Sequence, residues 1–189
     1  MRIGIDMDDT ITDTYSVLIP KIAEFYNIDP NRLYKSRYDY SVVEHMPNFN
    51  EFMKKYRYDY LLQDVPIRFN AKEVINSLYD QGCEIYIVTA RNDVEYDDPY
   101  LATKKCLEKN GIKYTKIIPY SNEKGSVCQK YNINLFIDDA LYNCKDVADS
   151  NIKSLQIRTI FRPVGDICVV DNWKEIYDFI KNITGNIIV

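Results

Sequence analysis

Three carboxylates follow a short apolar segment at the start of the chain. Residues 3–5 are Ile-Gly-Ile, and Asp6, Asp8 and Asp9 come directly after them. Because positions i and i+2 of an extended chain share a face, we expect Asp6 and Asp8 to point toward one spot. Carboxylates this close repel each other, so the arrangement calls for a bound cation or for a catalytic use of a raised pKa. The alternative interpretation is an acidic turn after an edge strand.

The composition excludes several classes of function. The 189 residues carry a net charge of −4 without a long basic run, so the electrostatic footprint of a protein that binds duplex nucleic acid is absent. No apolar stretch approaches the length that spans a membrane, and the first residues do not resemble a signal peptide. We therefore expect a cytoplasmic protein with no membrane or nucleic-acid partner and with one sizeable core plus an inserted subdomain. The oligomeric state stays open.

The cysteines and the single histidine narrow the possible chemistry. The five cysteines are odd in number and lack C-x-x-C spacing, which argues against a disulfide framework and against a structural zinc site. We expect them to fill the core. His45 stands alone and can build neither a histidine metal site nor a Ser-His-Asp triad. Any acid–base chemistry must therefore fall to carboxylates.

Beyond the acidic segment, the chain alternates between expected strands and expected helices. Strands are expected at 3–5, 84–88, 116–118, 135–137 and 154–157, and helices at 14–28, 71–79, 100–110, 123–131, 140–148 and 173–183. The alternation predicts an α/β fold: a doubly wound, Rossmann-like parallel sheet with helices on both faces. Residues 29–69 are rich in tyrosine and charge and predict two or three short helices. We expect residues 14–69 to form a small helical cap inserted after the first strand, and residues 1–13 and 70–189 to form a catalytic α/β core.

Polar side chains follow three of the expected strands. Asp6 and Asp8 follow the first, Thr89 follows residues 84–88, and Asp138 and Asp139 follow residues 135–137. In parallel sheets, sites gather at the carboxyl ends of the strands, near the point where the strand order reverses. The sequence therefore predicts that these side chains converge.

In order along the chain, these residues resemble the four motifs of the haloacid dehalogenase-like phosphatase superfamily. Residues 6–10, Asp-Met-Asp-Asp-Thr, resemble its first motif, D-x-D-x-T. Thr89 resembles the second motif, Lys124 ahead of a helix the third, and Asp138-Asp139 the fourth. The resemblance covers most of residues 1–13 and 70–189.

Two further features bear on the resemblance. Asp9 stands where the family usually has glycine, which leaves its role open. Within the superfamily, the early cap, the short length and the Trp-x-x-Ile of residues 173–176 resemble the small cytosolic 5'(3')-deoxyribonucleotidase-like branch.

The resemblance implies a Mg²⁺-dependent phosphomonoesterase. Asp6 would be the nucleophile and would form an aspartyl-phosphate. Asp8 would be the general acid for the leaving alcohol and then the base for water. Mg²⁺ would lie among the side chains of Asp6 and Asp138 and the backbone carbonyl of Asp8, a set of hard oxygen ligands.

The other motif residues have implied roles with open alternatives. Thr89 would donate its hydroxyl to a phosphate oxygen, and Lys124 would neutralise charge on the transferred phosphoryl group. Thr89 could instead cap a helix. Lys130 is the alternative to Lys124 as the lysine that neutralises the phosphoryl group. Asp139 would orient Lys124 or a metal-bound water, with direct ligation as the alternative. Arg91 would pair with Asp93 or Glu95, or else contact the substrate phosphate.

The substrate is expected to be a small phosphate ester, with a (deoxy)nucleoside monophosphate as the leading candidate. The cap holds eight of the 17 tyrosines, and aromatic rings can stack on bases, although tyrosines more often pack against protein. Candidate contacts are Phe25, Arg37, Tyr38 and Tyr40. Arg162-Pro163 is expected to be a loop, with a place near the site as its alternative. A sugar phosphate, or a phosphate-binding protein without turnover, are the other interpretations; the spacing of an EF-hand calcium loop is absent.

Overall fold

A six-stranded parallel sheet forms the centre of the computed structural model, which describes residues 1–35, 47–48, 50–52, 65–93, 96–160 and 162–185. The strands are β1 (Arg2–Ile5), β2 (Glu84–Val88), β3 (Lys116–Ile118), β4 (Leu135–Asp138), β5 (Lys153–Ile157) and β6 (Val169–Val170). The helices are α1 (Thr14–Tyr26), α2 (Pro30–Lys35), α5 (Ala71–Asp80), α6 (Pro99–Lys109), α7 (Lys124–Lys130), α8 (Leu141–Asp149) and α9 (Trp173–Thr184).

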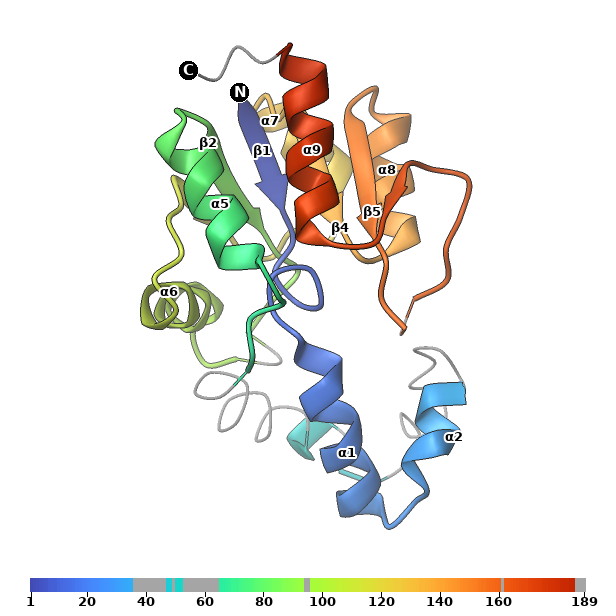
Figure 1. The fold of residues 1–189 in the computed structure, drawn as a ribbon. Helices are drawn as coiled ribbons and strands as arrows, with labels where there is room; N and C mark the ends of the chain where they lie inside the picture. The colour runs from blue at the N-terminus through green and yellow to red at the C-terminus, as the bar shows by residue number, and fades with distance from the viewer. Residues whose placement is uncertain (36–46, 49, 53–64, 94–95, 161, 186–189) are drawn as a thin grey trace.

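The strand order is β3-β2-β1-β4-β5-β6 (Figure 1). This is the order of a doubly wound, Rossmann-like sheet, in which the direction of winding reverses between β1 and β4. The expected fold class is therefore confirmed. The reversal leaves a crevice at the carboxyl ends of β1 and β4, where Asp6 follows β1 and Asp138 ends β4.

Alternate residues of the strands pack under helices on opposite faces. Ile87 belongs to one buried cluster with Ile75 of α5 and Ile176 of α9. Its neighbour Val88 belongs to another cluster, which contains Val147 of α8. Figure 1 shows α5 and α9 crossing the near face of the sheet while α7 and α8 lie behind it. Both faces are thus covered, as parallel sheets require.

Most of the expected elements differ from the observed ones only at their ends. The expected helix at 14–28 ends at Tyr26, because Asn27 takes a left-handed conformation with φ 51° and closes the helix. Strand β6 was not expected: two residues show no periodicity, and their strand character comes from pairing with β5. Four cysteines are buried as expected, whereas Cys168 is exposed. None of the helices in the described ranges is long and apolar enough to cross a membrane.

The chain leaves the core before α1 and returns to it before α5. The two connections run side by side: Asp13 donates its amide to the carbonyl of Pro66 at 2.8 Å, and Arg68 donates to that of Ile11 at 2.9 Å. Figure 1 shows α1 and α2 beyond the carboxyl ends of the strands. Residues 36–46, 49 and 53–64 of the expected cap lie outside the described residues. They include Arg37, Tyr38 and Tyr40.

Candidate functional site

The loop after β1 is built by backbone hydrogen bonds. The amide of Asp6 donates to the carbonyl of Ile137 at 2.9 Å, which extends the pairing of β1 with β4. The amides of Ile11 and Thr12 both donate to the carbonyl of Met7, which turns the chain back on itself. This turn leaves Asp6 and the following residues at the carboxyl edge of the sheet.

Asp9 caps the helix that leaves the core. Its φ of 59° lies in the left-handed region, which glycine adopts freely and aspartate tolerates. Its Oδ1 accepts the amide of Tyr15 at 3.0 Å, so Asp9 supplies a cap for α1. Burial and the nearby Asp139 raise the pKa of Asp9 well above its ordinary value. Asp9, whose role the sequence left open, therefore has a structural role as a cap of α1.

Asp6, Asp138 and Asp139 form a buried acidic cluster. One carboxylate oxygen from each lies within 4.8 Å of the others. Asp138 is held in place because its two oxygens accept the amide of Ala140 at 2.8 Å and the side-chain amide of Asn143 at 2.9 Å. Burial raises the pKa of all three carboxyls, that of Asp139 to about 6.

Lys124, the first residue of α7, reaches into this cluster. Its Nζ donates to Oδ1 of Asp6 at 2.8 Å and to the backbone carbonyl of Val88. Burial opposes the charged amine, but Asp6 and Asp138 outweigh it and raise the pKa of Lys124. Lys130, the alternative candidate for this lysine, is exposed and lies over the ring of Tyr131. The geometry thus favours Lys124.

Thr89 and Arg91 follow β2 and face the same spot. Thr89 is buried, lines the cavity above Asp6, and accepts the amide of Arg91 at 3.3 Å. The guanidinium of Arg91 grips Asp8 with two hydrogen bonds of 2.8 Å, from Nε to Oδ2 and from a terminal nitrogen to Oδ1. The expected partner Asp93 is exposed and has no such contact with the buried Arg91; Glu95 lies outside the described residues.

Asp8 is tied to two different elements. Besides the guanidinium of Arg91, it accepts the hydroxyl of Thr14, the first residue of α1, at 2.8 Å. Along the sequence, Asp8 stands close to the acids Asp6 and Asp9. In the structure, Nε of the buried Arg91 lies 2.8 Å from Oδ2 of Asp8. A bidentate pair of this kind fixes the orientation of a carboxylate and stabilises its charged form.

Arg162 lies in a loop, as expected, and this loop brings it to the lining of the cavity, the place that the sequence offered as the alternative. It follows β5 and donates from Nε to Oδ2 of Asp139 at 3.0 Å and from a terminal nitrogen to the hydroxyl of Tyr15 at 3.1 Å. Asp139 therefore contacts Arg162, whereas the amine of Lys124 contacts Asp6. The sequence contains one indication of this role: Arg162 comes soon after a strand, and sites in parallel sheets lie at the carboxyl ends of the strands.

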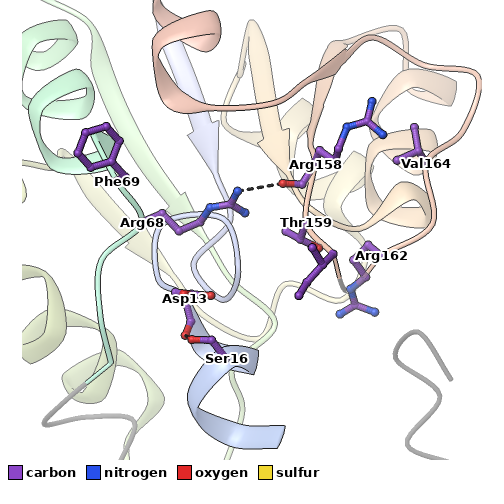
Figure 2. A pocket seen from close by; sticks show the side chains of 9 residues that line it. Asp13, Ser16, Arg68, Phe69, Arg158, Thr159, Arg162 and Val164 are labelled. Atoms are coloured by element: carbon purple, nitrogen blue, oxygen red, sulfur yellow. Dashed lines mark hydrogen bonds between the residues drawn. The ribbon is translucent and has the colours of Figure 1, made fainter. Parts of the chain in front are cut away.

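Two cavities meet at Arg162. The smaller, of about 270 Å³, is lined by Asp6, Asp8, Tyr15, Thr89, Arg91, Asp139 and Arg162, among others. The larger, of about 840 Å³, lies between the start of α1, the segment before α5 and the loop after β5 (Figure 2). The first is polar and small enough for a phosphate group, and the second has room for a larger ligand.

The acidic cluster fits a hard divalent cation. Three carboxylates offer oxygen ligands within 4.8 Å, and burial has raised their pKa values because the lysine and arginine beside them do not offset the desolvation. Oxygen ligands of this type, on two different loops, suit Mg²⁺. The donor set thus agrees with the metal that the sequence implied.

Solved structures with the same fold include haloacid dehalogenase-like hydrolases and a predicted phosphatase. A haloacid dehalogenase-like family hydrolase from Streptococcus pneumoniae superposes with a TM-score of 0.70 at 14% identity, covering 95% of this chain and 97% of that one. A predicted phosphatase from Clostridium acetobutylicum gives 0.70 at 15% identity, covering 96% and 98%. The HAD-hydrolase YfnB from Bacillus subtilis, bound to magnesium, gives 0.63 at 16% identity, covering 94% and 97%.

These likenesses establish the fold. No family model and no curated protein matches the sequence. At identities of 14–16%, the similarity resides in the arrangement of the elements, and the chemistry must be argued from the site itself.

Proposed function

We propose that the chain is a Mg²⁺-dependent phosphomonoesterase of the haloacid dehalogenase-like superfamily that acts through an aspartyl-phosphate. One observation carries the proposal: Lys124 and the carboxylates of Asp6, Asp138 and Asp139 meet at the reversal point of the sheet. A buried nucleophile next to a buried cation suits the transfer of an anionic group.

Asp6 and Asp8 divide the chemistry between them. A carboxylate oxygen of Asp6 attacks phosphorus and the bond to the leaving oxygen breaks, while Asp8 gives that oxygen a proton. In the second half, Asp8 takes a proton from water, the water oxygen attacks phosphorus, and the bond to Asp6 breaks to release phosphate. Thr89 and Lys124 hold the phosphoryl oxygens throughout. Asp8 must receive a proton before the first step, whereas the guanidinium of Arg91, 2.8 Å away, favours its carboxylate form.

The metal would be held by the side chains of Asp6 and Asp138 and by the backbone carbonyl of Asp8. When bound, Mg²⁺ offsets the repulsion between the carboxylates and the phosphoryl group. Asp139, which Arg162 holds in position, would orient a water of the metal or ligate it directly.

Residues 14–69 are proposed to act as the cap over this site. The substrate proposed from the resemblance is a (deoxy)nucleoside monophosphate, as in a 5'-nucleotidase, and a sugar phosphate is the alternative. Phe25 is half-exposed and packs against Phe52, with ring centroids 4.7 Å apart, so it combines a surface for a ligand with a fixed position.

The test is a turnover assay with Asp6→Asn. We expect the purified protein with Mg²⁺ to release phosphate from one or more of a panel of nucleoside monophosphates, sugar phosphates and an aryl phosphate. Asp6→Asn should lower kcat at least about 10³-fold because the nucleophile is lost. Asp149→Asn, an equal change on the exposed side of α8, is the control and should leave the rate unchanged. Substrate binding without any phosphate release would favour the non-catalytic alternative.

A further inference from the structure

The larger cavity contains Arg68, whose charged form is favoured by the nearby carboxylates of Asp9, Asp139 and Asp13. Arg68 donates to two backbone carbonyls, those of Asp9 at 2.6 Å and Arg158 at 2.9 Å. Within the described ranges it has no ion pair with a carboxylate. Three of its five N–H groups are therefore left over, and burial lowers the pKa of Arg68 because the charged guanidinium is partly withdrawn from water.

The other two arginines of this cavity are already paired. Arg158 contacts Asp171 at 2.6 Å, and Arg162 contacts Asp139 at 3.0 Å. Figure 2 shows the guanidinium of Arg68 reaching from the segment before α5 toward the loop after β5, into the space between the two. Arg68 is thus the cation of this cavity that is best placed to receive an added anion.

Large apolar side chains stand exposed around the same space. Ile160 and Val164 on the loop after β5 are 78% and 42% exposed, and Phe69 beside Arg68 is 86% exposed. Exposed apolar groups that line a cavity together mark a surface for a ligand more than scattered ones do. A ligand with an apolar body and an anionic end would complement both features.

The cavity is continuous with the proposed reaction site. Arg162 lines both cavities, and consecutive residues at the start of α1 divide between them: Tyr15 lines the smaller and Ser16 the larger. A phosphate ester with its phosphoryl group at Asp6 could therefore extend its leaving group past Arg162. The smaller cavity, at about 270 Å³, leaves little room for that group.

We propose that the larger cavity binds the leaving group of the substrate and that Arg68 binds a second anionic group on it, a carboxylate or a phosphate. This inference rests on the proposed function and narrows its substrate class. The preferred phosphate esters would carry a further negative charge beyond the phosphate that is cleaved. Among nucleotides, a bisphosphate would be favoured over the monophosphate.

Two matched pairs of substrates test the inference. Phenyl phosphate is compared with 4-carboxyphenyl phosphate, and thymidine 5'-monophosphate with thymidine 3',5'-bisphosphate. In one pair or both, the member with the second anion should have a kcat/KM about 10-fold to 100-fold higher, the range expected for a charge-assisted hydrogen bond. Arg68→Met should reduce that ratio to near one, and Arg68→Lys should give an intermediate ratio. The ratio cancels any loss of folded enzyme, because both substrates are measured on the same sample.

Lys153→Met is the matched control, since it removes one positive charge from the exposed start of β5, at the opposite end of that strand. It should leave both ratios as in the wild type. If Arg68→Met changes neither ratio, the inference is overturned. If free benzoate alters phenyl phosphate turnover through Arg68 while the ratios stay at one, the anion is a separate ligand and the inference is likewise overturned. If the wild type cleaves none of these four esters and none of the wider panel of nucleoside monophosphates and sugar phosphates, the proposed function itself fails.

Discussion

Asp8 is the site residue whose surroundings the sequence describes least well. Along the chain it stands close to Asp6 and Asp9, but its contacts in space include the guanidinium of Arg91 and the hydroxyl of Thr14. A proton donor must be aimed at the leaving oxygen to be effective. Arg91 is anchored by burial and by the ring of Tyr96, 5.1 Å away, so it can act as a positioning residue for Asp8.

Replacing Arg91 should therefore affect turnover more than substrate binding. In Arg91→Met the carboxylate of Asp8 loses both 2.8 Å bonds, and we expect kcat to fall about 10-fold to 100-fold with KM changed less than about threefold. Arg91→Lys should lie between, because an amine cannot form the same fork. Steady-state kinetics, with thermal unfolding to correct for loss of folded protein, would measure this. A rise in KM with kcat unchanged would instead indicate a contact with the substrate phosphate.

The site residues that could be predicted are those whose signal is local. Asp6 and Thr89 follow strands and Asp138 ends one, and a strand end can be recognised from a few apolar neighbours. Arg91 and Arg162 acquire their roles from contacts 83 and 23 positions away, with Asp8 and Asp139. Such pairings depend on the strand order, which the sequence pattern does not specify.

At the scale of elements, the packing of α7 against α8 holds Lys124 in place. Gly125 allows this close approach: a Cβ there would lie 2.3 Å from Oγ of Ser150 and 2.6 Å from the carbonyl of Asp146. The amide of Gly125 also donates to Oδ2 of Asp146 at 2.7 Å, which ties the start of α7 to α8. Any larger residue at position 125 must push the helices apart and move Lys124 with them.

Gly125→Ala should therefore destabilise the protein although alanine favours helices. We expect a loss of about 1–3 kcal/mol, the usual range for overpacking, and a lower kcat as Lys124 shifts relative to Asp6. Chemical denaturation and the turnover assay would measure the two effects. Ser126→Ala, on the exposed side of the same helix, is the control and should change neither. An unchanged unfolding free energy for Gly125→Ala would contradict the close packing of α7 and α8.

The elements of the core could be predicted because their patterns are strong, whereas in the inserted segment only the first helix, α1, could be. In β4, residues 135–137 are a continuous apolar run before Asp138, as is typical of parallel strands buried on both faces. Residues 29–69 mix tyrosines, charges and breakers, whereas residues 14–28 show a rough helical stripe. The two-residue strand β6 lies below the length at which any period can be seen.

At the scale of the whole molecule, the fold gathers its buried charges at one end of the sheet. Asp6, Asp138 and Asp139 are each at most 7% exposed, and burial disfavours their charged forms. Lys124 and Arg162 balance part of this charge. Metal-free protein should thus be strained electrostatically at neutral pH, and a divalent cation should relieve that strain.

The direction of the pH dependence follows from Asp139. Its pKa is about 6 in the folded protein against an ordinary 3.8, so between these values the folded state keeps a proton that the unfolded chain has released. The stability contributed by Asp139 is therefore present below pH 3.8 and is lost as the pH rises to about 6. The raised pKa values of Asp6 and Asp138 act in the same direction. Asp139→Asn should weaken the pH dependence of metal-free unfolding over this range.

Magnesium should consequently stabilise the protein more at pH 7.5 than at pH 5, because it binds the carboxylate form. At a concentration 100 times its Kd, the gain is about 2.7 kcal/mol, which for a chain of this size raises Tm by about 5–10 °C. Thermal unfolding with Mg²⁺ or EDTA at both pH values measures this without any assumption about the substrate. Asp138→Asn should remove most of the shift at pH 7.5, while Asp149→Asn should keep it. Equal shifts at both pH values, or a shift that survives Asp138→Asn, would place the cation away from the acidic cluster and remove it from the proposed reaction.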